Sequence, residues 1–168
     1  MASSQNSGQP GRQRAQSDEP QIIIQGNRVE QTDLEATNSY LSDTIHEGET
    51  VLQLMNKSAF NDFKDLLKLK QKCTTLIDCL RQFGSQSNSA FFKCLTDALE
   101  CFKQIKYQLQ RYLDANMLRR SYIASDVRAQ LRQCSNKLTF VELLLESMYN
   151  NNSNANLISN AVLNHLQS

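Results

Sequence analysis

The chain has 168 residues, of which 40% are apolar and 21% charged, and its formal net charge at pH 7 is +1. This length suits one domain with a tail, and the composition excludes a wholly disordered chain. The near-neutral charge gives no overall attraction to nucleic acid, so nucleic acid is not an expected partner.

Glycine and proline are scarce in this sequence. It has five Gly and two Pro, and the prolines are Pro10 and Pro20. Long stretches are therefore free of helix breakers, whereas an all-β fold would need more turn residues. The sequence predicts an all-α fold: an antiparallel bundle of four long helices, with a short C-terminal helix and a disordered N-terminal tail.

The predicted tail covers residues 1–27, and residues 28–168 form the predicted helical domain. The tail is rich in Ser, Gln, Gly and Arg, and it has too few apolar groups to offset the entropy of ordering. It contains one apolar island, Ile22–Ile24, whose β-branched residues favour extended backbone. The island is either a strap that lies against the bundle or a short motif for a partner.

The tail also contains a candidate phosphosite, Ser17. Arg12 and Arg14 precede this serine by five and three residues. Basophilic kinases recognise that pattern, because guanidinium groups pair with acidic residues of the kinase. Phosphorylation would add nearly two negative charges beside Asp18 and Glu19. The simpler interpretation is a solvated tail with no such role.

The first helix is predicted over residues 30–56, with Thr32 or Asp33 as its cap. Gly48 lies within it and costs about 1 kcal/mol relative to alanine, so a bend or break is predicted at 46–49. The predicted buried face is Leu34, Leu41, Ile45, Leu52 and Met55.

The second helix is predicted over residues 58–83, with a Ser58 cap and with Gly84 just after its end. Its lysines at 64, 68 and 72 lie opposite the apolar face. That face is predicted to contain Ala59, Leu66, Leu69, Cys73, Leu76, Ile77 and Leu80.

The third helix, predicted over residues 89–117, has the widest apolar arc and is expected at the centre of the bundle. The fourth is predicted over 121–149, with Ser121 or Ser125 as its cap. An Asn-rich loop at 150–156 and a short helix at 157–166 are expected to follow. The fourth helix has apolar residues three and four apart, at Val127, Leu131, Cys134, Leu138, Val141, Leu145 and Met148.

Charge is unevenly distributed along the chain. Residues 31–56 contain five acidic residues and no Lys or Arg, whereas the next two predicted helices are basic. The simpler interpretation is an acidic helix packed beside basic neighbours. The alternative is a weak contact with an anionic membrane surface or a phosphoinositide, made by the basic faces of the second and third helices and centred on Lys64, Lys68 and Lys72.

Nothing in the sequence indicates a reactive site. The five cysteines include no Cys-x-x-Cys pair, and His46 and His165 lie far from them in sequence. Phosphate-binding loops and hydrolase motifs are missing as well. The sequence therefore predicts no catalytic residue, no metal ligand and no cofactor, and it predicts reduced thiols that pack as small apolar groups.

The sequence contains neither an apolar run of the ~20 residues that span a bilayer nor a signal-peptide core. We therefore expect a cytoplasmic protein, with the nucleus as the alternative, that is neither secreted nor transmembrane.

The fourth predicted helix has a second apolar cluster, formed by Phe140, Leu143 and Leu144, on the side away from its main face. Either the terminal helix at 157–166 covers this cluster or another protein does. The second alternative gives the functional hypothesis: a non-catalytic adaptor or complex subunit that docks other proteins through an exposed helix face.

Overall fold

The computed structural model describes residues 34–84 and 88–167, with side chains described as far as Asn152. The chain divides into two units, Met1–Ala36 and Thr37–Ser168. Of the first unit, only residues 34–36 are described, and they are helical. The predicted tail at 1–27, with Ser17 and Ile22–Ile24, lies outside the described residues.

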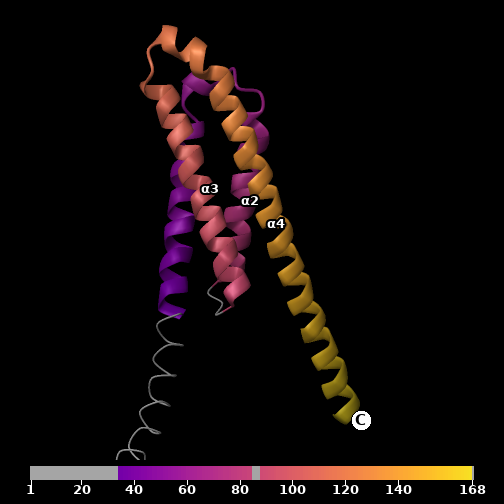
Figure 1. The fold of residues 1–168 in the computed structure, drawn as a ribbon. Coiled ribbons are helices and arrows are strands. Elements are labelled where there is room, and N and C mark those ends of the chain that lie inside the picture. The colour runs from indigo at the N-terminus through magenta and orange to yellow at the C-terminus, as the bar shows by residue number, and fades with distance from the viewer. Residues whose placement is uncertain (1–33, 85–87, 168) are drawn as a thin grey trace, which may run out of the picture. The chain divides into compact units, whose positions relative to one another are not determined.

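The described chain is helical and contains no strand. A first helix covers residues 34–55. A 3-10 turn at Ser58–Phe60 follows, and then α2 at Leu66–Phe83, α3 at Ser89–Asp114 and α4 at Met117–Gln167. Both α2 and α3 pack against α4 (Figure 1). The all-α prediction is confirmed.

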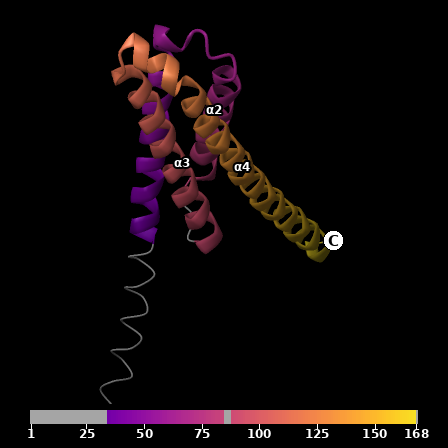
Figure 2. The same ribbon diagram turned by 45° about the horizontal axis from the view of Figure 1, so that its top comes forward.

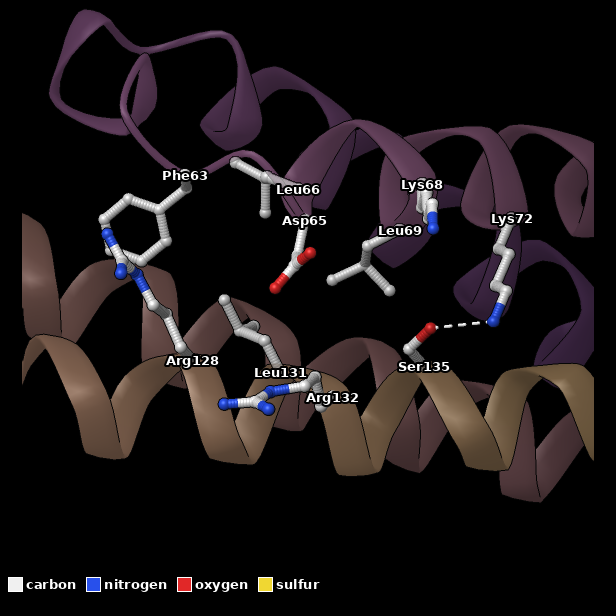
Figure 3. A pocket seen from close by; sticks show the side chains of 10 residues that line it. All are labelled: Phe63, Asp65, Leu66, Lys68, Leu69, Lys72, Arg128, Leu131, Arg132 and Ser135. Atoms are coloured by element: carbon white, nitrogen blue, oxygen red, sulfur yellow. Dashed lines mark hydrogen bonds between the residues drawn. The ribbon is translucent and has the colours of Figure 1, made fainter.

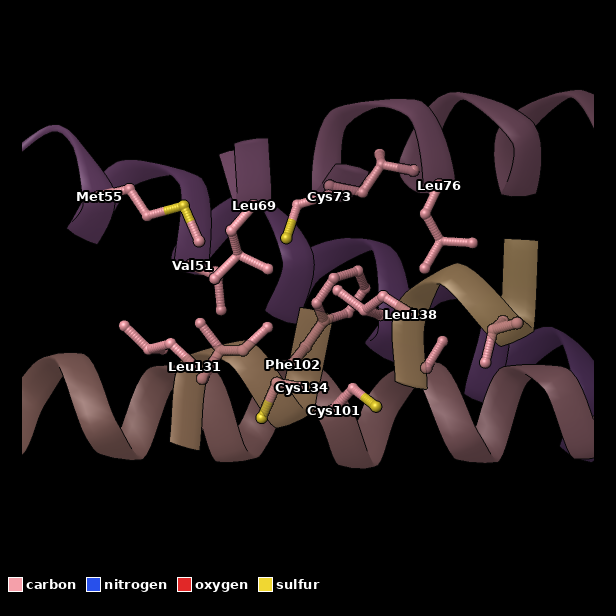
Figure 4. Packing of buried hydrophobic residues seen from close by; sticks show 14 of the residues in the cluster. Val51, Met55, Leu69, Cys73, Leu76, Cys101, Phe102, Leu131, Cys134 and Leu138 are labelled. Carbon is pink, nitrogen blue, oxygen red and sulfur yellow. The ribbon is translucent and has the colours of Figure 1, made fainter. Parts of the chain in front are cut away.

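The helices share one hydrophobic core, and α3 contributes the most to it. Its buried side chains are Phe91, Cys94, Leu95, Ala98, Leu99, Cys101, Phe102, Ile105, Gln108 and Leu109. Figure 4 shows Phe102 between residues of the other helices, with Cys73 and Leu138 close by. The wide apolar arc predicted for the third helix is therefore buried in the structure.

The buried face of the first helix overlaps the predicted one, because Met55 is buried and Leu41, Ile45 and Leu52 pack against the core, but it also includes residues that the prediction left out. From Thr37 to Met55, the side that faces the core has residues spaced by four and three positions: Thr37, Leu41, Thr44, Gly48, Val51 and Met55. Leu34 is exposed, and Ile45 and Leu52 are only half-buried. The prediction counted large apolar residues, but the buried face uses two threonines and a glycine.

Thr44 shows how a polar residue can occupy this face. It is fully buried, and its hydroxyl donates to the carbonyl oxygen of Tyr40, 2.6 Å away. The same hydroxyl lies 3.5 Å from the carbonyl oxygen of Leu95 on α3. A buried hydroxyl that has such a partner avoids the cost of an unsatisfied polar group.

Gly48 marks a close approach of helices and not a break in the helix. The helix continues through it without interruption, so the predicted break at 46–49 is wrong. A Cβ atom at this position would lie 2.8 Å from Ile77 Cδ1 and 3.0 Å from Phe102 Cε2. The missing side chain therefore lets the first helix contact α2 and α3 closely.

The segment before α2 is a tight connection and not the first turns of a helix. The predicted start at residue 58 is wrong, because α2 begins at Leu66 and only Ser58–Phe60 forms a 3-10 turn. Phe60 and Phe63 are buried and stack edge to face with ring centroids 5.6 Å apart. The ring of Phe63 also contacts Tyr112 of α3, so aromatic packing fixes this connection.

A short turn joins α3 to α4 at residues 115–116. The side chain of Asn116 accepts a hydrogen bond from the backbone N–H of Arg119, and the helix starts at Met117. The predicted caps, Ser121 and Ser125, lie inside the helix and are wrong. Arg120 donates to the carbonyl oxygens of Tyr112 and Leu113, which satisfies acceptors at the end of α3.

The helix α4 is continuous to Gln167, so the predicted loop at 150–156 is wrong and residues 157–166 continue the same helix. Asparagine is a weak helix former, but its cost is below about 1 kcal/mol per residue, and the segment contains neither Gly nor Pro. Tyr149 contacts Phe83, the last residue of α2. Beyond that contact α4 runs past the ends of α2 and α3 (Figures 1 and 2).

The acidic first helix is paired with basic neighbours, as the simpler interpretation of the charge pattern predicts. Glu49 forms an ion pair with Arg81 of α2. Glu47 pairs with Lys106 of α3, with 2.9 Å between the charged atoms. These pairs involve Arg81 of α2 and Lys106 of α3. Other basic residues of α2, such as Lys68 and Lys72, take no part in them.

Candidate functional site

The three predicted partner-binding residues lie together on the outer side of α4, which we call the outer α4 patch (Phe140, Leu143 and Leu144). Their exposed fractions are 63%, 58% and 38%. The neighbouring residues Leu138 and Val141 are buried in the core. Because successive residues of a helix are about 100° apart, the patch and the buried residues occupy different sides of the same turns.

The continuous course of α4 bears on what covers this patch. Residues 157–166 belong to the same continuous helix as Phe140, Leu143 and Leu144. Within the described part of the chain, these side chains are open. A patch of large apolar side chains on a helix is a common feature of protein-binding surfaces.

A second candidate surface is a groove of about 310 Å³ between α2 and α4, which we call the α2/α4 groove (Figure 3). Its floor is apolar, and positive side chains border it on both helices. The residues that line it are Phe63, Asp65, Leu66, Lys68, Leu69, Lys72, Arg128, Leu131, Arg132 and Ser135.

The structure places two of the three predicted lysines in this groove. Lys68 and Lys72 line it, whereas Lys64 lies in the turn before α2 and is not part of the lining. The helix α4 adds Arg128 and Arg132, which the sequence analysis missed. Their spacing of four residues was a visible signal, but only the packing shows that they face α2.

Two of the four cations are held in place by neutral partners. Lys72 Nζ donates to Ser135 Oγ across the groove at 2.9 Å. The guanidinium carbon of Arg128 lies 4.7 Å from the centroid of the Phe63 ring, in cation–π geometry. Neither contact neutralises charge, so both side chains keep a full positive charge in a defined position.

Carboxylates are few near these cations. Within residues 34–84 and 88–152, none of Lys68, Lys72, Arg128 and Arg132 forms an ion pair. The carboxylate of Asp65 lies in the middle of the groove, beside Leu66 (Figure 3). Burial and the neighbouring Glu146 raise the pKa of the Glu142 carboxyl. Lys72 lowers this pKa by a smaller amount. The groove has four cations and one carboxylate in its lining.

Four of the five cysteines belong to the core (Cys73, Cys94, Cys101 and Cys134), and Cys79 is half-buried. Burial raises the pKa of the Cys73 thiol to about 12 and that of Cys101 to about 11. Burial also raises the pKa of Cys79, Cys94 and Cys134. A nucleophilic cysteine needs a lowered pKa, so these thiols have the opposite of that property.

The described side chains show no metal centre, because no group of three or more His, Cys, Asp or Glu residues among them is placed to hold an ion. His46 is exposed on the first helix, and the side chain of His165 lies outside the described residues. The helices of the described chain also include none with the length and apolar character needed to cross a membrane.

Comparison with known proteins gives no further assignment. The chain matches no family model, and searches of curated proteins and of solved structures also find no match.

Proposed function

We propose that this protein is a non-catalytic interaction module, built as an antiparallel bundle of four helices, that docks partner proteins on the outer α4 patch. It would act as an adaptor or as a subunit of a larger complex. The partner would lay the apolar side of a helix along Phe140, Leu143 and Leu144. In this mode of docking, the contacts are made by residues three and four positions apart on one side of a helix.

The observation that supports the proposal is the exposure of Phe140 and Leu143, each more than half accessible, on a rigid helix. Their neighbours in the sequence are core residues, so the backbone beneath the patch is firmly held. A preorganised apolar patch loses little entropy on binding. Residues of this kind at the centre of an interface often provide most of the binding energy.

The test is a pair of charge substitutions on the same helix. Leu143→Asp places a carboxylate in the patch, and Leu118→Asp places one at an exposed leucine near the start of α4, outside the patch. Each tagged protein is expressed in its native cell, purified with its partners, and analysed by mass spectrometry. Circular dichroism verifies that each variant keeps its helix content.

We expect Leu143→Asp to reduce recovery of specific partners at least tenfold, and Leu118→Asp to leave it within about twofold. Unchanged recovery with Leu143→Asp in a folded monomer would refute the proposed docking surface. Equal losses with both variants would show that the effect is not specific to the patch.

A further inference from the structure

The α2/α4 groove is positively charged in a chain whose formal net charge is only +1. We propose that it binds an acidic segment of a partner polypeptide, with carboxylates seated on Lys68, Lys72, Arg128 and Arg132. This site is separate from the outer α4 patch and shares none of its residues.

The first argument is that four cations without an ion-pair partner in the described part of the chain line one groove. Lys106, Arg81 and Arg111 each have a carboxylate within ion-pair distance. The four cations of the groove have none among the described residues. Like charges gathered around one hollow repel each other, and an anionic ligand would remove that repulsion.

The second argument is the arrangement of the charges. Lys68 and Lys72 are one turn apart on α2, and Arg128 and Arg132 are one turn apart on α4, so each row extends about 6 Å along its helix. The two rows are displaced along the groove, with Arg128 beside Phe63 and Lys72 beside Ser135, and they match carboxylates that are spaced along a chain (Figure 3). Arginine also binds a carboxylate through two parallel hydrogen bonds.

The third argument is the floor between the rows. Phe63, Leu66, Leu69 and Leu131 line it, and each is buried, so the floor is apolar and already packed. Such a floor accepts the aliphatic stem of a glutamate or a small apolar side chain. The floor offers no hydrogen-bond donor to the phosphate oxygens that would point towards it.

The same features disfavour a lipid headgroup. A compact polyphosphate needs cations that converge on one point, whereas these lie in two rows. Asp65, whose carboxylate lies in the middle of the groove, would also repel the multiple charges of such a group. A peptide can avoid Asp65 by placing a neutral or basic residue beside it.

The experiment measures binding of a short fluorescent peptide to the full chain by anisotropy. The probe has pairs of glutamates four residues apart with leucines between them, and a second probe has glutamine in place of each glutamate. The protein variants are the double reversal Lys68→Glu with Arg132→Glu and a control reversal, Lys93→Glu with Lys103→Glu. The control makes the same change in net charge on exposed residues of α3.

We expect the glutamate probe to bind and the glutamine probe to fail. The double reversal in the groove should raise the dissociation constant about tenfold or more, because two attractions become two repulsions, and the control should change it by less than about twofold. Binding should weaken as salt is added. If the reversal fails to fold by circular dichroism, Lys68→Gln with Arg132→Gln replaces it, and its expected loss is about threefold.

Three results would overturn the proposal. The glutamate probe does not bind, or both reversals weaken it equally, or vesicles containing phosphatidylserine bind through the groove residues while the peptide does not. The last result would assign the groove to a membrane surface. The variant Leu143→Asp should bind the probe normally, so a failure of the outer α4 patch and a failure of the groove are distinguishable.

Discussion

The two sides of α4 contain similar residues that have different roles. On the inner side, Leu138 and Leu145 are 0% and 1% exposed, whereas on the outer side Leu143 is 58% exposed. All three are leucines on neighbouring turns of one helix. Hydrophobicity alone therefore does not determine burial, and the difference depends on which side meets α2 and α3.

This difference separates structural residues from available ones. A side chain packed on every side loses its contacts when it is truncated, and the cavity left behind adds to the cost. A side chain that is mostly in water loses little when it is truncated in the free protein. Stability measurements on the two sides of α4 should therefore give different results, and this comparison can be tested directly.

The largest effect is expected for Leu138→Ala. This side chain is fully buried in the core, so its truncation should lower the free energy of unfolding by about 2–5 kcal/mol. The matched control, Leu143→Ala, should change it by less than about 0.5 kcal/mol. Urea unfolding followed by circular dichroism measures both values. Similar losses for the two variants would show that the outer side is also packed in solution.

The inner side of α4 was predictable from the sequence because its spacing is regular. Six of the seven predicted residues are buried, and Met148 is half-buried. The apolar face of α2 is confirmed from Leu66 onward for the same reason. Large apolar residues at intervals of three and four leave only one side of a helix to face the core.

The first helix was harder to interpret because its buried side is made partly of small or polar residues. Thr37, Thr44 and Gly48 follow the same intervals as Val51 and Met55. A search for apolar residues passes over them. Thr44 is accommodated in the core by a hydrogen bond to Tyr40 of its own helix, whereas Gly48 is accommodated because α2 and α3 leave no space for a side chain there.

The segment before α2 did contain a local signal. Phe60, Phe63, Leu66 and Leu69 recur every three residues, and the first of them lies in a 3-10 turn, whose period is three. The α2/α4 groove had no complete local signal. Its lysines and arginines come from helices that are about 60 positions apart in the sequence, so only tertiary packing brings them together.

The second prediction compares a buried and an accessible cysteine thiol of α2. Cys79 of α2 is half-buried, whereas Cys73, six residues earlier in the same helix, is fully buried. The pKa of Cys73 is raised to about 12, so this thiol stays protonated at pH 8 and is also shielded. Iodoacetamide should modify Cys79 at least about a hundredfold faster than Cys73.

Mass spectrometry of peptides sampled over time gives the rate at each cysteine. The variant Cys79→Ser should lose the fast reaction, and Cys73→Ser should keep it. Raising the pH from 7 to 9 should increase the absolute rate at Cys79 far more than that at Cys73, because a pKa of about 12 keeps the Cys73 thiol almost fully protonated even at pH 9. Equal rates in the folded protein would contradict the burial of Cys73.

The smallest effect is expected at Gly48, where packing and helix propensity act in opposite directions. Gly48→Ala gains up to about 1 kcal/mol of helix propensity, but its Cβ would lie 2.8 Å and 2.9 Å from Ile77 Cδ1 and Cγ1. Overpacking of this kind costs about 1–3 kcal/mol. We therefore expect a net loss of about 1 kcal/mol in the free energy of unfolding, measured with urea.

A double-mutant cycle shows whether lack of space is the cause. Ile77→Ala removes both close atoms, so the variant with both changes should lose about 1 kcal/mol less than the sum of the single losses. Additive losses would mean that Gly48 is not held by contact with α2. A positive coupling would instead show that the inner side of the first helix selects residues by the space that its neighbours leave, which apolar spacing in the sequence does not reveal.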